Sequence, residues 1–355
     1  MKMAKPEAKP DSRGKYFRGS QKGQQFSLII TLVLVYVFMA MMNGSRFLSL
    51  YNLSSMAYQL PLIGFLSIGM MISILSGGIN LSIIANANFN GIVISLVLGV
   101  LTGGKMAQAN GLVIIIAILA GFLSSVLIGT LNGLLITKLN IPAILATLGT
   151  MTLFQGINLV VTKGYTISGF PPALLFIGNG TIAGFIPVPI ILFIVVVIIT
   201  HFILDRSSFG KKLYMTGANQ KAARFSNVNV SRVIIQEYIL SACFASLTSI
   251  VMIGQMNSVK ANYAESYLLV SILASFLGGV DPAGGFGKLS GMVLAAIILQ
   301  LISTGLNLMR LDPFMITAMW GAIIIIILVV KELALFVRKA IGFRSGPRKQ
   351  HKQGV

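Results

Sequence analysis

Side-chain amides and hydroxyls are the groups of this sequence whose type and spacing point to chemistry. A cluster of them follows a glycine pair at 77–78 inside an apolar stretch: Asn80, Ser82, Asn86, Asn88 and Asn90. Others lie in separate apolar runs: Asn132, Gln155, Asn158, Gln300 and Asn307. Amides around a glycine-broken membrane span can bind hydroxyl-rich solutes without the larger cost of burying a charge. For any single amide, the alternative is a hydrogen bond between helices. The residues predicted to line a solute pathway are Asn80, Ser82, Asn86, Asn90, Gln155 and Asn307.

No segment predicts an enzyme. Residues 287–290 resemble the end of a phosphate-binding loop, but Pro282 stands where the first glycine is needed. Leu289 also stands where Ser or Thr must hold magnesium. The two histidines and the single cysteine lie apart, in a pattern that fits neither a metal site nor a disulfide framework. We therefore expect no catalysis, no metal and no cofactor.

A polar, basic island from Phe209 to Arg232 separates two long apolar runs. Together with residues 205–206 it carries six Lys or Arg and one acid. Asn219 can cap a short helix over residues 220–225, and Asn227 tolerates the left-handed conformation that ends one. A capped surface helix between two membrane spans predicts a docking surface for another protein.

The composition requires membrane-spanning elements to hold these residues. Of the 355 residues, 55% are hydrophobic and 10% are charged, whereas soluble domains carry about 25% charged residues. The net charge of +19 is not accompanied by zinc-finger spacing or by a basic helix interleaved with aromatics. We therefore interpret the charge as membrane topology and not as nucleic-acid binding. The expected fold class is all-α, a polytopic membrane protein.

About ten helices are expected to cross the membrane, because ten apolar runs approach the roughly 20 residues that a spanning helix needs. They are 25–43, 57–76, 80–102, 110–137, 142–162, 188–204, 233–255, 266–280, 288–309 and 313–330. Segments 57–102 and 266–288 are candidates for broken or re-entrant helices, because the first contains the glycine pair and the second holds a short run.

Positive charge predicts the orientation of these spans. With both termini in the cytoplasm, all but five of the 27 Lys and Arg lie inside, as expected for cytoplasmic segments. The predicted organisation is a charged, mobile cytoplasmic tail over 1–24, a transmembrane domain over 25–330 and a basic cytoplasmic tail over 331–355. Within the domain, 205–232 is the docking loop. The Gly- and Pro-rich stretch 163–187, without helical periodicity, is the external contact loop.

Two further patterns concern packing. Gly121, Ser125, Gly129 and Gly133 recur every four residues, which predicts a stripe where a neighbouring helix approaches closely. Glu237 lies near the start of its span, and we expect it to pair with Arg232 at the membrane interface.

Five motifs, in order, resemble those of the simple-sugar (ribose-type) ABC importer permeases, over residues 50–330. They are SGGINLS at 76–82, PAILATLGTM at 142–151, GANQKAARFSNV at 217–228, GGVDPAGGFGKLSG at 278–291 and TGLNLM at 304–309. Asn80 stands where the family has Asp, and Leu268 and Val270 stand where it often has acids.

The resemblance implies a permease subunit for a monosaccharide or similar polyhydroxylated solute in the inner membrane of a prokaryote. Its implied partners are a cytoplasmic ATPase, an extracytoplasmic solute-binding protein and a second permease copy, with a homodimer favoured over a heterodimer. The implied ATPase-docking residues are Gly217, Asn219, Ala222, Ala223, Arg224, Phe225 and Ser226. Two alternatives stay open: an ion-coupled secondary transporter acting alone, and a permease for a nucleoside or furanosyl signal molecule.

Overall fold

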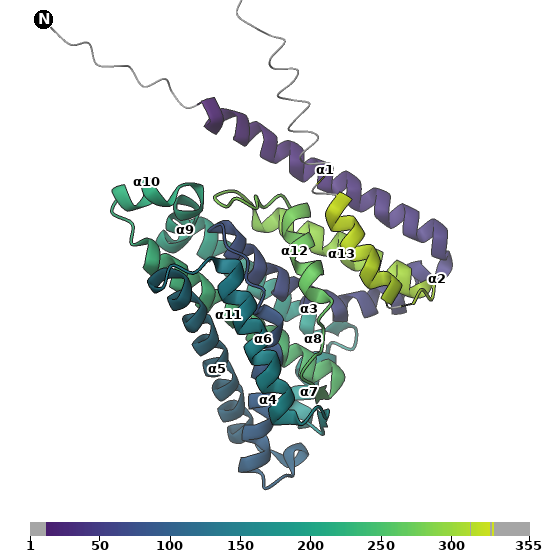
Figure 1. The fold of residues 1–355 in the computed structure, drawn as a ribbon. Helices are drawn as coiled ribbons and strands as arrows, with labels where there is room; N and C mark the ends of the chain where they lie inside the picture. Colours follow the sequence, from purple (N-terminus) through teal and green to yellow (C-terminus); the bar gives the residue numbers. More distant parts are fainter. Residues whose placement is uncertain (1–11, 313, 327–328, 330–355) are drawn as a thin grey trace, which may run out of the picture. The chain divides into compact units, whose positions relative to one another are not determined.

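The computed structural model describes residues 12–312, 314–326 and 329. The chain divides into two units, Met1–Arg310 and Leu311–Val355. The described part of the second unit includes a helix over Phe314–Ile326, and the predicted basic tail over 331–355 lies outside the described residues. The first unit contains all the elements considered below (Figure 1).

The first unit is built almost entirely from helices. The long and medium helices are α1 (Ser12–Asn43), α3 (Leu50–Leu75), α4 (Ile83–Leu101), α5 (Gly111–Lys138), α6 (Ala143–Thr162), α8 (Val188–His201), α9 (Ser208–Ala218), α11 (Val230–Met256), α12 (Tyr267–Leu277) and α13 (Leu289–Leu308). The short ones are α2 (Ser45–Leu48), η1 (Met106–Gln108), α7 (Pro172–Asn179), η2 (Phe202–Arg206) and α10 (Gln220–Phe225). Four two-residue strands, β1 (Ile167–Ser168), β2 (Thr181–Ile182), β3 (Ile186–Pro187) and β4 (Ser258–Val259), pair antiparallel as β1–β4 and β2–β3.

Each of the ten predicted apolar runs folds as a helix. In the described part of the chain, eight helices are long and apolar enough to cross a membrane, and two shorter apolar helices, Tyr267–Leu277 and Phe314–Ile326, account for the rest. The 11 residues of α12 span about 16 Å, which is about half of the hydrocarbon core. The all-α, polytopic membrane fold is therefore confirmed, with α12 as a short helix.

The glycine pair does interrupt the chain. Helix α3 ends at Leu75, Gly77 has a φ of 88°, and α4 begins at Ile83. A side chain at Gly77 would be strained, because only glycine adopts this left-handed backbone freely. We call residues 76–82 the α3–α4 break.

Helix α11 lies at the centre of the first unit and packs against α3, α4, α5 and α7 (Figure 1). The predicted small-residue stripe on α5 forms part of this contact. A Cβ at Gly129 would crowd the backbone of Tyr238, and one at Gly133 would crowd that of Ile235. Small residues therefore allow α5 and α11 to approach closely, as the spacing predicted.

Two local expectations were wrong. Segment 163–187 contains α7, which begins at Pro172 because proline suits the first turn of a helix. It packs on α11 where Gly178 meets Gly254. Residues 12–24 of the predicted mobile tail belong to α1, which begins before the candidate span at Gln25–Asn43.

Candidate functional site

The basic island folds into the pair of helices α9 and α10. The Asn219 side chain accepts a hydrogen bond from the Ala222 backbone N–H at 3.0 Å. Asn227, two residues after the end of α10, has a φ of 59°. Both predictions about this helix, its cap and its left-handed end, are confirmed.

Only some of the predicted docking residues are exposed. Ala222, Arg224, Phe225 and Ser226 are exposed, and the Phe225 ring is 93% exposed. Ala223, in contrast, is only 2% exposed and anchors α10 to its own chain. A large aromatic side chain held out on a polar segment is typical of a protein contact.

Helix α9 contacts the last residue of α3, directly before the α3–α4 break, through the backbone. A Cβ at Gly217 would overlap the Leu75 carbonyl oxygen, and the Gly285 backbone N–H donates to that same oxygen at 2.8 Å. The Tyr214 hydroxyl donates to the Gly287 carbonyl at 3.0 Å. Burial, and secondarily the Asp205 carboxylate, raise the pKa of Tyr214, so this hydroxyl keeps its proton. The C-terminal end of α9 is thus in contact with the end of α3, next to the α3–α4 break.

A buried chain of side-chain hydrogen bonds connects this break to three other helices. Asn80 donates to Ser241 on α11 at 2.9 Å, and Ser82 donates to Asn80 at 2.8 Å. Asn132 on α5 donates to Ser82 at 2.8 Å, and Thr150 on α6 donates to Asn132 at 2.7 Å. We call Asn80, Ser82, Asn132, Thr150 and Ser241 the polar chain. It joins α5, α6 and α11 through the break.

The amides of α4 continue this polar region. Asn86 donates to the Ser125 carbonyl at 3.3 Å, and Asn90 donates to the Ser246 hydroxyl at 3.1 Å. Among the described residues, the buried side-chain oxygens of Asn86, Asn90 and Asn158 have no hydrogen-bond partner. An unpaired buried acceptor is costly, so these amides can still accept hydrogen bonds from another molecule.

The other two predicted pathway residues lie elsewhere. Gln155 is half-buried on α6. Asn307 is exposed and lines a separate hollow with residues of α2 and α3. Four of the six predicted residues, Asn80, Ser82, Asn86 and Asn90, are therefore close along the break and α4, and their role in a pathway stays a prediction.

The expected pairing of Glu237 with Arg232 is wrong. Arg232 is exposed, whereas Glu237 is fully buried, with Oε1 2.5 Å from the Ser76 hydroxyl at the α3–α4 break. Its Oε2 has no hydrogen-bond partner among the described residues. The sequence did not predict this contact. The position of Glu237, seven residues after the start of α11 and inside an apolar span, was the signal that could have indicated a buried acid.

Within the described residues, His, Cys, Asp and Glu side chains nowhere gather in a group of three that could hold a metal ion. The arrangement is suited to hydrogen bonding of neutral polar groups inside a helical bundle, with the exposed helix α10 at its edge.

Known proteins resemble this chain over most of its length. The family described as "Branched-chain amino acid transport system / permease component" matches residues 52–330. The ribose import permease protein of Bacillus subtilis is 31% identical over 305 residues, which cover 85% of this chain and 91% of that protein.

More distant matches cover less of the chain. The autoinducer 2 import system permease protein of Photorhabdus temperata is 30% identical over 210 residues, covering 58% of this chain and 63% of that protein. Its counterpart from Salmonella typhimurium is 28% identical over 212 residues, covering 58% and 64%. No solved structure matches.

Proposed function

The chain belongs to the family of transport-system permease components, and from that premise we propose that it is the permease subunit of an ATP-driven importer. It forms the membrane path for a monosaccharide or similar polyhydroxylated solute, while a separate subunit hydrolyses ATP. The observation that carries this proposal is the isolated, capped helix α10, whose Phe225 ring is 93% exposed on a basic surface.

Helix α10 provides the contact with the ATPase. Exposed aromatic and Arg side chains are enriched among residues that dominate protein–protein binding, and Phe225 and Arg224 are adjacent here. The contact of α9 with the end of α3, next to the α3–α4 break, then offers a route from the ATPase to the polar chain. ATP-driven movement of α10 would alter the access of solute to the buried amides.

The full-length chain, co-expressed with the ATPase of its transport system, tests this contact. Phe225→Glu should weaken the ATPase contact about 30-fold and so remove most of the co-purified ATPase, because an exposed aromatic anchor is worth about 2 kcal/mol. The matched control is Phe185→Glu, since Phe185 is also exposed, at 70%, but lies in segment 163–187. Equal recovery of the ATPase with wild type and Phe225→Glu would refute docking through α10.

The chemistry of the polar region supports a sugar-like solute. The family description names branched-chain amino acids, whereas the relative aligned over 91% of its length is a ribose permease. A zwitterionic amino acid needs charged partners, but the predicted pathway residues are amides and a hydroxyl, which suit neutral polyols. The autoinducer 2 relatives keep a furanosyl signal molecule as the alternative solute.

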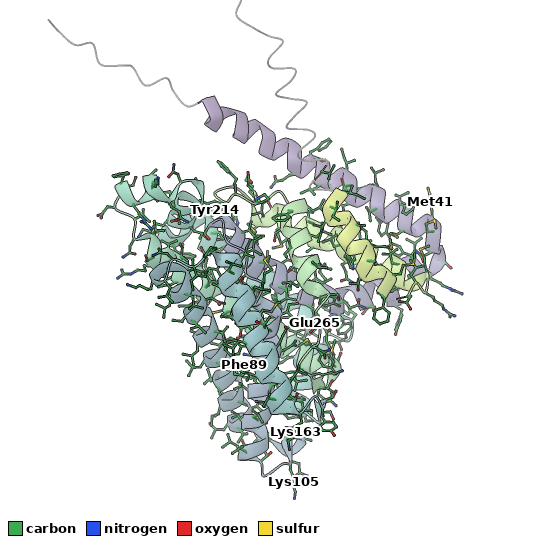
Figure 2. The ribbon with its side chains drawn as sticks, viewed as in Figure 1. Met41, Phe89, Lys105, Lys163, Tyr214 and Glu265 are labelled. Atoms are coloured by element: carbon green, nitrogen blue, oxygen red, sulfur yellow. The ribbon has the colours of Figure 1, made fainter. Side chains whose placement is uncertain are left out.

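We place the chain in the inner membrane of a prokaryote with both termini in the cytoplasm. Lys105 and Lys163, labelled in Figure 2, lie at the opposite end of the helices from Tyr214 on α9. This separation supports an extracytoplasmic position for segment 163–187, where a solute-binding protein would dock, and a cytoplasmic position for α10.

A second copy of the chain completes the path in this proposal, with α6 as the contact surface. One side of α6 is a hollow of about 420 Å³ lined by residues that include Thr152, Gly156 and Val160. Gly149 and Gly156 are open, since a Cβ on either would meet nothing within 4 Å. Small residues on an exposed span favour close packing of a neighbouring helix.

Cysteine cross-linking tests this pairing, because Cys243→Ser removes the only cysteine. In that background Gly156→Cys should form a disulfide between two copies, whereas Gly99→Cys, also at an open glycine, should not. A stoichiometric, non-identical permease in the purified complex would replace the homodimer with a heterodimer.

A further inference from the structure

A hollow of about 580 Å³ lies where α2 and the start of α3 meet the end of α13, away from the polar chain. Its lining is Ser45, Arg46, Ser49, Tyr51, Asn52, Ser55, Gln59, Thr304, Asn307 and Leu308. Nine of these ten residues carry a polar side chain, and none is acidic. The volume falls within the range of about 300–1,000 Å³ that is typical of small-molecule sites.

Hydrogen bonds fix the rim of the hollow. Ser49 donates to the Arg46 carbonyl at 2.9 Å and accepts from the Asn52 backbone N–H at 3.2 Å. The Asn52 side chain, which is buried, donates to the Phe47 carbonyl at 2.8 Å. The turn that carries Arg46 is therefore held in one conformation before any ligand arrives.

Three lining residues, Ser55, Gln59 and Thr304, are also held by hydrogen bonds, two of them to Gln300 behind the lining. Gln59 donates to Ser55 at 3.0 Å, while Gln300, which is 3% exposed, donates to Gln59 at 3.1 Å and to Thr304 at 3.0 Å. Its Oε1 is buried without a hydrogen-bond partner among the described residues. The hydroxyl and amide side chains of this group can turn their hydrogens toward a ligand that has hydrogen-bond donors and acceptors of its own.

The electrostatics of the hollow favour one negative charge. Arg46 is exposed, and no ion pair of Arg46 is found in the described part of the chain. The first turn of the 26-residue helix α3 also lines the hollow through Tyr51 and Asn52. Its backbone N–H groups and helix dipole add to the attraction for an anion.

The surroundings of the hollow are apolar and face outward. Residues 44–49 connect two candidate membrane spans, so the hollow lies at the boundary of the hydrocarbon core. Leu50 and Tyr51 are 84% and 87% exposed, and Met41, labelled near the end of α1 in Figure 2, is 79% exposed. Aromatic side chains at this depth are typical of the membrane interface.

We propose that this hollow is a binding site for the headgroup of an anionic glycerophospholipid of the phosphatidylglycerol type. The phosphate lies against Arg46 and the start of α3, the glycerol hydroxyls lie against the Ser, Asn and Gln side chains, and the acyl chains follow the exposed apolar residues. A headgroup with an ammonium ion is disfavoured, because the lining has no carboxylate to pair with it. The inference is independent of the transported solute.

Native mass spectrometry of the purified, delipidated transporter complex tests the site. Phosphatidylglycerol should bind with a Kd several-fold lower than that of phosphatidylethanolamine. Arg46→Gln should raise the Kd for phosphatidylglycerol about tenfold, because it removes the only cation among the lining residues. Asn307→Leu, which fills the hollow from its exposed edge, should weaken binding in the same direction.

The matched control is Lys105→Gln, because Lys105 is also an exposed cation in a connection between spans but lies outside the hollow. The Lys105→Gln variant should bind phosphatidylglycerol as the wild type does.

Equal affinity for both lipids, or an unchanged Kd in Arg46→Gln, would overturn the proposal. So would saturation of the site by inorganic phosphate or glycerol phosphate, which would indicate a soluble ligand. Loss of solute-binding protein from Arg46→Gln without loss of lipid would assign Arg46 to a protein contact instead.

Discussion

At the scale of single residues, the burial of the ionisable Glu237 side chain needs a physical explanation. It is a fully buried acid in a candidate span, and its contact is the Ser76 hydroxyl at the α3–α4 break. That hydroxyl also lies 3.0 Å from the Ser73 carbonyl. Ser76 has one hydrogen for two acceptors, so a neutral Glu237 that donates to Ser76 would satisfy both contacts.

Glu237→Gln should therefore be tolerated, because the amide is neutral and can donate to Ser76. Glu237→Leu should lower the melting temperature of the detergent-solubilised chain, since it leaves Ser76 with one partner fewer in a buried site. ATP-dependent uptake should survive Glu237→Gln. Loss of uptake in this stable variant would mean that the charge is needed, and would revive the ion-coupled alternative.

Asn80 is the second residue-scale test, because it joins the break to α11. Asn80→Ala removes both of its hydrogen bonds and should cost about 1–2 kcal/mol of stability. If the polar chain borders the solute path, Asn80→Ala and Asn80→Asp should also reduce uptake without loss of the ATPase. Ser124→Ala is the control, since Ser124 donates only within its own helix. Normal uptake by both Asn80 variants would remove this residue from the pathway.

Residue-scale predictions succeeded where the physics is local. The Asn219 cap depends only on the next three residues, so the sequence contained all the information needed. The partner of Glu237 depended on tertiary structure. Arg232 is five positions away, which places it about 140° around the helix, whereas Ser76 comes from a distant segment. Proximity in sequence was therefore a poor guide.

At the scale of elements, the base of α9 is the point where docking helix and membrane helices meet. Gly217 allows this contact, because any Cβ there would overlap the Leu75 carbonyl oxygen. The same oxygen accepts from Gly285, so three segments converge on one backbone group.

Gly217→Ala should impair transport while the ATPase still binds. The cap of α10 is local and should persist, so the ATPase should still co-purify, while uptake should fall about fivefold, in line with the energies of coupling residues. Gly99→Ala, on α4 with nothing within 4 Å of the added Cβ, should transport normally. Uptake by Gly217→Ala within twofold of the wild type would show that this contact does not transmit the ATPase movement.

The elements themselves were largely predictable from hydropathy. Each of the ten apolar runs is a helix, and the glycine pair marks the break, because glycine permits the φ of 88° at Gly77. Helix α7 was missed because it is short and stabilised by tertiary contact between Gly178 and Gly254. No periodicity over eight residues could have revealed that contact.

At the scale of the whole molecule, the proposed topology places two exposed positions on opposite sides of the membrane. In the Cys243→Ser background, an impermeant thiol reagent added to sealed, right-side-out vesicles should label Phe185→Cys and not Arg224→Cys. Both side chains are exposed, so accessibility within the protein does not explain a difference. Labelling of Arg224→Cys from outside would reverse the orientation and move α10 away from a cytoplasmic ATPase.

The central claim is that this chain is a sugar permease driven by an ATPase bound at α10, and ribose uptake into proteoliposomes tests it most directly. The vesicles contain the chain with the ATPase and solute-binding protein of its transport system. Uptake should require ATP and should be insensitive to collapse of proton and sodium gradients. It should fall at least about tenfold in Phe225→Glu, because loss of an aromatic anchor worth about 2 kcal/mol weakens the ATPase contact about 30-fold. Uptake that follows an ion gradient without ATP, or that is unchanged in Phe225→Glu, would contradict the account.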